Sequence, residues 1–532
     1  MNSYIPERLK ARYQSGKMSR RTFMQTLLSS GMTFTAATMV ADQALAAAPK
    51  RGGTFRLGKG HGQTTDTMNP GTAENGYMVN LLQSFHGYMT EVAPDGSLAP
   101  GIAESWEASP DGKTWSFNLR QGTTFHNGKS VSPEDVIASV NQHRGEDSTS
   151  AAKPLVAAVT DIAADGPNRV VFQLDSGNAD FPFVLSDYHI PIGLSEVGAV
   201  DWNTGIGCGA YKLDNFEPGV RSDLSRYDGH WDLANRAFFD SAEMLAITDT
   251  NARTSAMVAG DLDAIDRLDL KTVERIKQVP GITVHSIPGT QHFTFEMMCT
   301  SDPYTNVDLR LALKYAIDRQ ELVDKILFGY GVIGNDHPIG QGQRFFNKDL
   351  PQREYDPDKA KFHLKKAGFD SIDINLSASD AAFAGSVDAA VLYQNSASKA
   401  GIKIKPVREP NDGYWTDVWN VKPFVAVYWG GRPVEDQMFS TAYQSGVPWN
   451  GTRWSNVRFD ELLIAARAEL DEDKRRTMYY EMQELLSNDG GLIAPMFASY
   501  VFGTRDNVVT PAQLGSNWDM DGERCIERWS FA

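Results

Sequence analysis

The chain of 532 residues is long enough for two to four domains, and its composition, 41% hydrophobic and 22% charged, is that of a globular rather than a disordered protein. Its formal net charge is −16, which disfavours nucleic acid and anionic lipid surfaces as partners. No stretch is long and apolar enough to form a permanent membrane span.

Residues 1–46 read as an export signal. Residues 19–24 spell Ser-Arg-Arg-Thr-Phe-Met, a twin-arginine core, which a weakly apolar region over residues 27–40 and an Ala-Leu-Ala peptidase site at 44–46 follow. The alternative is a disordered basic tail followed by an amphipathic helix. No cysteine follows the apolar region, so we expect an unlipidated periplasmic protein, exported by the twin-arginine pathway, whose net charge is −20 once six basic and two acidic residues are removed.

Next in the chain, a first strand is predicted at residues 51–57, and a loop at Asn69-Pro70 leads into an apolar helix that contains Val79, Leu82 and Phe85. A hairpin and a capped helix follow. Pro110-Asp111-Gly112 is turn chemistry, and apolar and polar residues alternate over residues 115–120, which predicts a half-buried strand. Ser132-Pro133 and Asp135 form the start of a helix with a capping box.

Residues 122–130 resemble a phosphate-binding loop but hold five residues between the glycines where that loop needs four. The successive amides would not converge on a phosphate, so we expect a turn between two strands, with His126 as a hydrogen-bonded structural residue. The glycines at 205, 207 and 209 also lack the dinucleotide spacing, and we expect tight packing or a crossing between domains there.

Further along, helices and strands alternate. We expect a strand at residues 169–174, two helices over 308–329 with a capping box at Asp318, and a helix from Asp356-Pro357 to Gly368. Strands at residues 402–407 and 424–428 and amphipathic helices at 459–470 and 474–486 complete the pattern. This interleaving predicts an α/β architecture.

Four blocks in this order resemble the extracellular solute-binding proteins of family 5, the periplasmic components of dipeptide, oligopeptide and nickel ABC importers. They are the hairpin and helix of residues 99–144, Gly-Ile-Gly-Cys-Gly-Ala-Tyr-Lys at 205–212, Ala-Ile-Asp-Arg at 316–319 and Tyr-Asp-Pro-Asp-Lys-Ala-Lys at 355–361. The likeness extends over nearly the whole mature chain.

The resemblance implies a two-lobed periplasmic binding protein fold of the cluster C type, with an extra domain inserted in the first lobe. Lobe I would comprise residues 47–87, 201–290 and 491–532, the inserted domain II residues 88–200, and lobe III residues 291–490. A small molecule would bind between the lobes, and permease subunits in the inner membrane would receive it. We expect a monomer that does not bind nucleic acid.

The resemblance also implies that the loop before the first helix faces the ligand. Glu74, Asn75 and Tyr77 are therefore candidate pocket residues, and the alternative is that they form a surface turn and a helix cap.

The most informative segment is Val-Ala-Val-Tyr-Trp-Gly-Gly-Arg-Pro at residues 425–433. In peptide-binding relatives a strand ends in a tryptophan, and an aspartate three positions later pairs with the ammonium of the peptide. Trp429 fits that tryptophan, but Arg432 stands where the acid is expected. A guanidinium would repel an ammonium and would suit a carboxylate or phosphate.

Three alternatives remain open. The ligand is anionic or N-blocked, for which an opine is one example; or Glu435 or Asp436 replaces the missing acid and an ordinary peptide binds; or the ligand is of another kind. Arg432 could also point away and pair with a neighbour.

Aromatic residues cluster in the same region, and flat rings supply stacking area for a ligand. We choose Trp415 and Trp429 as candidate ligand-binding residues; the alternative is that these rings pack in the core. The other members of the cluster are Tyr414, Trp419, Trp449 and Trp454.

Other protein classes find less support. The chain has no GxSxG, no HExxH and no histidine pair at i, i+4, so we expect no catalytic residue and no enzyme, although a hydrolase is kept as an alternative. A solute sensor or chaperone is a further alternative. Cys208, Cys299 and Cys525 allow at most one disulfide and have no zinc spacing, so we expect core or loop thiols and neither metal nor cofactor.

Overall fold

The computed structural model describes residues 22–23, 26, 50–410, 413–432 and 434–532. The predicted export signal over residues 1–46 lies outside the described residues, apart from Thr22, Phe23 and Thr26. Within the described residues, no helix is both long and apolar enough to cross a bilayer.

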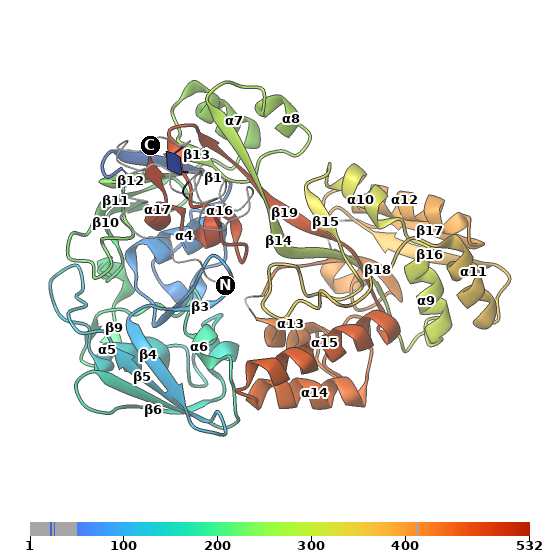
Figure 1. Ribbon diagram of the computed structural model, residues 1–532, viewed down its shortest axis with the longest axis horizontal. Helices are drawn as coiled ribbons and strands as arrows, with labels where there is room; N and C mark the ends of the chain where they lie inside the picture. The colour runs from blue at the N-terminus through green and yellow to red at the C-terminus, as the bar shows by residue number, and fades with distance from the viewer. Residues whose placement is uncertain (1–21, 24–25, 27–49, 411–412, 433) are drawn as a thin grey trace.

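Two long antiparallel strands, β14 (Ile282–Met297) and β19 (Leu492–Arg505), run from one lobe into the other (Figure 1). They are the centre of an 11-stranded sheet in the order β10-β11-β12-β1-β13-β19-β14-β18-β16-β17, with β15 paired to β19. The outer strands on one side belong to the first lobe and those on the other side to the second. The pair β14 and β19 therefore connects the lobes.

The first lobe forms where β1 pairs in parallel with β12 and β13, and where β10, β11 and β12 pair antiparallel. Its core packs Phe55, Tyr77 and Trp529 together from opposite ends of the chain. The elements are β1 (Thr54–Lys59), η1 (Pro70–Thr72), α4 (Gly76–Phe85), β10 (Tyr211–Glu217), β11 (Arg221–Arg226), β12 (Ser241–Ala246), α7 (Thr250–Ala259), β13 (Ala264–Ile265), α8 (Val273–Ile276), β20 (Val508–Val509), α16 (Asp519–Glu523), α17 (Cys525–Arg528) and β21 (Ser530–Phe531).

A separate antiparallel sheet, β4-β5-β7-β6, lies beside the first lobe with its own core around Phe117 and Phe172. The predicted turn at Gly112, strand β5 and capping box of Ser132 with Asp135 are confirmed. The elements are β2 (Thr90–Val92), β3 (Leu98–Pro100), β4 (Ala103–Ala108), β5 (Thr114–Leu119), α5 (Pro133–Asn141), η2 (Lys153–Val156), β6 (Val159–Ala164), β7 (Arg169–Leu174), α6 (Phe181–Val184), β8 (Ser195–Glu196), β9 (Ala199–Val200) and η3 (Trp202–Thr204).

The phosphate-loop look-alike is a turn, as expected, but it connects β5 to α5 rather than two strands, and only an isolated bridge between Thr124 and Ser130 closes it. His126 is structural: its Nδ1 accepts from the Gly207 amide, and its Nε2 lies 3.2 Å from the Gly209 carbonyl oxygen. A Cβ on Gly207 would come 1.9 Å from the Phe85 carbonyl oxygen, which confirms the predicted tight packing.

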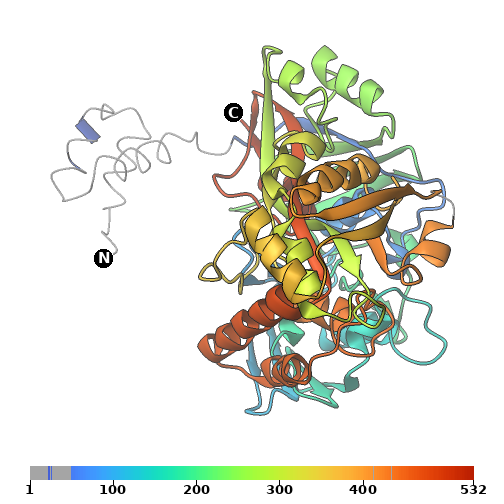
Figure 2. The same ribbon diagram turned by 90° about the vertical axis from the view of Figure 1, so that its right-hand side faces the viewer.

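The second lobe has its core on β14, β18, β16 and β17, where β16 pairs in parallel with both neighbours. Helix α12 packs on β17 and β16, and this lobe is nearest the viewer in Figure 2. The elements are α9 (Val307–Tyr315), α10 (Arg319–Ile326), β15 (Gly331–Ile333), α11 (Pro357–Lys366), β16 (Ile372–Ala378), α12 (Ser386–Ser398), β17 (Ile402–Arg408), η4 (Tyr414–Val418), β18 (Phe424–Trp429), α13 (Glu435–Ala442), α14 (Val457–Ala468) and α15 (Glu472–Asp489).

The predicted α/β fold with two lobes is confirmed, and the caps at Asp318 and Asp356 lie where the sequence places them. The residue boundaries given above for lobe I, domain II and lobe III stay a prediction.

Candidate functional site

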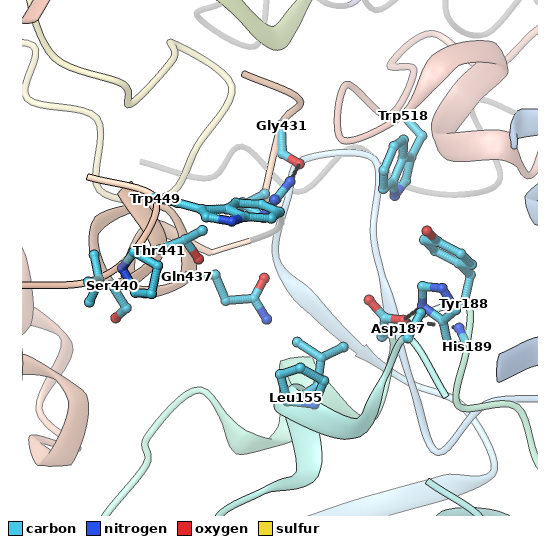
Figure 3. A pocket seen from close by; sticks show the side chains of 15 residues that line it. Leu155, Asp187, Tyr188, His189, Gly431, Gln437, Ser440, Thr441, Trp449 and Trp518 are labelled. Carbon is cyan, nitrogen blue, oxygen red and sulfur yellow. Dashed lines mark hydrogen bonds and ion pairs between the residues drawn. The ribbon is translucent and has the colours of Figure 1, made fainter. Parts of the chain in front are cut away.

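A cavity of about 750 Å³ opens between the two lobes. Residues of the first lobe and its neighbouring sheet, among them Leu155, Tyr188 and Trp518, face Gly431, Gln437 and Trp449 of the second lobe across it (Figure 3). Because both lobes supply walls, a molecule held here touches both.

Arg432 enters this cavity from the loop after β18. The loop crosses β14 so closely that a Cβ on Gly431 would lie 1.7 Å from the hydroxyl oxygen of Thr290, and only glycine permits this approach. The Arg432 guanidinium has long hydrogen bonds to two carbonyl oxygens, those of Gly430 (3.4 Å) and Gly431 (3.3 Å).

The charge of Arg432 is not matched nearby. Among the described residues, no carboxylate oxygen lies within 4.0 Å of its guanidinium nitrogens. Burial lowers its pKa, and the more distant Tyr188 and Asp187 act in the opposite direction. A half-buried cation without a carboxylate partner is a site that an anion would stabilise.

The opposite wall comes from the segment Asp187 to His189 and from Trp518. The His189 ring has its Nδ1 2.7 Å from Asp187 Oδ1 and its Nε2 3.0 Å from the Ala73 carbonyl oxygen. These two contacts hold the His189 ring against Asp187 and the Ala73 carbonyl and fix this wall. Tyr188 packs edge-on against Trp518 at 5.7 Å between ring centroids. Burial raises the pKa of Tyr188, and Arg432 opposes that rise.

Glu435 and Asp436 do not line the cavity. Glu435 is 2% exposed, and its Oε1 accepts a hydrogen bond of 2.7 Å from the Phe345 amide. Asp436 forms an ion pair of 3.1 Å with Arg467. Both carboxylates are engaged within the second lobe, and Gln437 is the residue of this turn that faces the cavity.

The candidates just before and at the start of α4 are not among the lining residues of the cavity. Asn75 caps α4: its side chain accepts from the amides of Tyr77 and Met78 and donates to Asp66. Tyr77 is fully buried, and its hydroxyl hydrogen-bonds with Ser222. Glu74 is exposed, and its charge contributes to the raised pKa of Tyr188.

The tryptophans form a second cavity of about 420 Å³ that adjoins Arg432. We call its five aromatic lining residues the aromatic box; they are Trp415, Trp419, Tyr428, Trp429 and Trp449. Trp415 is 39% and Trp449 51% exposed, whereas Trp429 is 5% exposed. The two tryptophans singled out from the sequence therefore belong to one group.

Glu296 of β14 lies against this box and was not identified from the sequence. The indole nitrogens of Trp429 and Trp419 donate to its two carboxylate oxygens, at 2.9 and 3.3 Å. Burial raises the pKa of Glu296 to about 7, although both hydrogen bonds act in the opposite direction. The signal was the alternation of His292, Thr294 and Glu296 with apolar residues, which marks a polar face that is nevertheless buried.

A further contact to the second lobe comes from Asp180. Asp180, which precedes α6, is buried and accepts from Arg344 at 2.8 Å and from Arg475 of α15. Burial raises the pKa of Asp180, but the two guanidinium groups outweigh it, and the pKa lies below its usual value.

Side chains of metal-ligating types and thiols occur in the described part of the chain. No group of three or more histidine, cysteine or acidic residues there could hold a metal ion. Cys208, Cys299 and Cys525 are free thiols.

Comparisons with known proteins identify a matching family and several relatives. The model of the bacterial extracellular solute-binding proteins, family 5 Middle, matches residues 97–451. The dipeptide-binding protein of Escherichia coli K12 is 25% identical over 449 residues, which cover 77% of this chain and 81% of that protein.

Solved structures share the fold. HbpA2 from Haemophilus parasuis has a TM-score of 0.79 at 19% identity, covering 90% of this chain and 100% of that one. The PBP AgaA from A. tumefaciens R10, in complex with agropinic acid, has a TM-score of 0.70 at 20% identity, with 90% and 99% covered.

Proposed function

Because the chain belongs to the bacterial extracellular solute-binding proteins of family 5, which serve ABC importers, we propose that it captures a small peptide-like acid in the periplasm and delivers it to a membrane permease. The observation that carries this proposal is the guanidinium of Arg432, which lies in the interlobe cavity without a carboxylate partner among the described residues. One relative, which matches 77% of this chain, is a dipeptide-binding protein, and this supports a ligand of that size.

Capture follows from the geometry of the cavity. A ligand whose acid group meets Arg432 while its body contacts Tyr188 and Trp518 binds both lobes at once. Such a ligand binds more tightly when the lobes are together, so it shifts the population toward the closed form. A permease that recognises the closed form then receives loaded protein only.

The charge of the ligand follows from Arg432. A carboxylate can accept two parallel hydrogen bonds from a guanidinium, whereas a free ammonium would meet a like charge. The two acids that would rescue an ordinary peptide are engaged elsewhere, Glu435 with the Phe345 amide and Asp436 with Arg467. AgaA, which shares the fold, is in complex with agropinic acid, so this fold accepts an acid.

A matched pair of dipeptides tests the sign of this charge. We expect N-acetyl-Ala-Ala to raise the melting temperature of the mature protein more than Ala-Ala does, because only the blocked peptide lacks the ammonium. In Arg432→Asp the order should reverse, and in Arg408→Gln, whose side chain is 77% exposed, it should not change. A free dipeptide that binds equally well to wild type and to Arg432→Asp would refute the proposal.

We also propose export through the twin-arginine pathway, a monomeric state and no catalytic activity. Replacing Arg20 and Arg21 by lysine should retain the precursor in the cytoplasm, which fractionation would detect. Released ligand should be chemically unchanged after prolonged incubation; a cleaved product would indicate a hydrolase.

A further inference from the structure

The ring planes of the aromatic box meet at steep angles, from 48° between Trp429 and Trp449 to 78° between Trp415 and Trp419. Trp419 is at its centre: its ring plane makes angles of 78°, 77° and 74° with those of Trp415, Trp429 and Trp449, at centroid distances of 5.8 to 6.3 Å. Trp415 and Tyr428 meet at 73°. A flat ring would need two parallel faces to be enclosed, whereas walls that meet at steep angles suit a compact, rounded group.

The box offers π faces rather than free hydrogen-bond donors at its base. The N–H groups of Trp419 and Trp429 are both engaged by Glu296, so neither can orient a sugar hydroxyl. Donating these hydrogens to a carboxylate also enriches the rings in electron density. Electron-rich faces attract a cation.

Glu296 adds to the same preference. It is 2% exposed, and in the part of the chain that the structure describes no lysine or arginine nitrogen lies within 4.0 Å of its carboxylate. A buried carboxylate without a cationic partner is costly unless something compensates its charge. A cation held in the box would be such a partner, acting through the two indole rings.

We propose that the aromatic box binds a compact quaternary ammonium group, carried by the same ligand whose acid meets Arg432. This inference rests on the proposed function, because Arg432 lines both cavities and places the acid at the rim of the box. The ligand is then a zwitterion with its two charges separated by a short spacer. Its ammonium lies in the box rather than at position 432, where the guanidinium repels it.

Two compounds of the same shape isolate the role of charge. Choline and 3,3-dimethylbutan-1-ol differ in having a quaternary nitrogen or a carbon at the branch point. We expect choline to change the tryptophan fluorescence of the mature protein saturably, with sodium chloride as the ionic control, and to bind about tenfold more tightly than the alcohol.

Variants locate the site. Trp449→Leu should weaken choline about fivefold or more without loss of folding, because that side chain is half exposed; Trp106→Leu, in the separate sheet, should leave choline binding unchanged. Glycine betaine, which adds a carboxylate, should exceed choline in wild type, and this gain should disappear in Arg432→Gln.

The outcomes separate the two proposals. Equal binding of the alcohol and choline would refute the cationic subsite, as would unchanged choline binding in Trp449→Leu. If acids bind through Arg432 but choline does not bind in the millimolar range, the subsite is refuted and the proposed function stands. If choline binds as expected but betaine gains nothing from Arg432, the role of Arg432 in the proposed function is refuted instead.

Discussion

Replacing Asp180 by asparagine should loosen the contact between the two lobes. The carboxylate accepts from Arg344 and Arg475, and both lie on the other side of the cleft from Asp180. Asparagine keeps the size and one acceptor oxygen but removes the charge. Two guanidinium groups then face each other with one neutral acceptor between them.

The magnitude follows from burial. Removing one partner of a buried ion pair costs about 3–5 kcal/mol. Asp180 and Arg475 are 3% exposed in their side chains, but that of Arg344 is 21% exposed, and water partly compensates it. We therefore expect a loss of about 2–3 kcal/mol, which shifts the equilibrium between closed and open forms by roughly 30- to 150-fold.

Distances between spin labels on the two lobes would measure this shift. Val197, between β8 and β9 beside the first lobe, and Phe362, on α11 of the second lobe, are both exposed, so Val197→Cys and Phe362→Cys provide the attachment points. Asp180→Asn should lengthen the mean distance in ligand-free protein, and Asp373→Asn, which removes a surface pair within the second lobe, should not. A lower melting temperature with an unchanged distance distribution would refute the reasoning, because the contact would then stabilise both forms equally.

Three further predictions concern buried ionisable side chains. Burial raises the pKa of Glu296 to about 7, so its contribution to the free energy of unfolding is complete below about pH 4.5 and is lost as the pH rises through 7. This loss amounts to up to about 3 kcal/mol, and urea unfolding of Glu296→Gln at several pH values should lack it. Lys59→Met should lower the unfolding free energy by about 3–5 kcal/mol in the same assay, because Glu523 (2.7 Å) and Asp266 (3.2 Å) lose their buried cation. Burial raises the pKa of Cys208 to about 12, and a thiol reagent should count three thiols only after denaturation.

Each of these has a control. The pH slope is read as a difference from wild type, because Asp519, whose pKa burial also raises to about 7, contributes in the same direction. Lys361→Met, on the surface, should cost less than about 0.5 kcal/mol. The first prediction is contradicted if the stability of wild type and of Glu296→Gln depends on pH with the same slope. The second is contradicted if Lys59→Met and Lys361→Met lose equal unfolding free energy, and the third if fewer than three thiols are counted.

Local features of the fold could be predicted from the sequence because short-range chemistry determines them. The cap at Ser132, the turn at Gly112 and the strand at residues 424–428 need only their neighbours in the chain. The candidate at Arg432 came from a fixed offset after Trp429, and the structure places it in the interlobe cavity. The turn before α5 was misjudged because β5 is not followed by a second strand.

The remainder of the site depends on distant parts of the chain. Tyr188 and Trp518 are more than 300 residues apart and meet only because β14 and β19 return the C-terminal segment to the first lobe. Asn75 was proposed for the pocket, yet it caps α4, which short-range reasoning had offered as the alternative. Glu296 has no motif, since its partners are Trp429 at the end of β18 and Trp419, which follows η4.

The central claim is that an acid binds at Arg432, and native mass spectrometry of mature protein isolated from the periplasm tests it most directly. We expect a mass excess that denaturation releases as a small acid without a free primary amine, and we expect Arg432→Asp to lose it. Release of ordinary short peptides with free amines, retained by Arg432→Asp, would contradict the account.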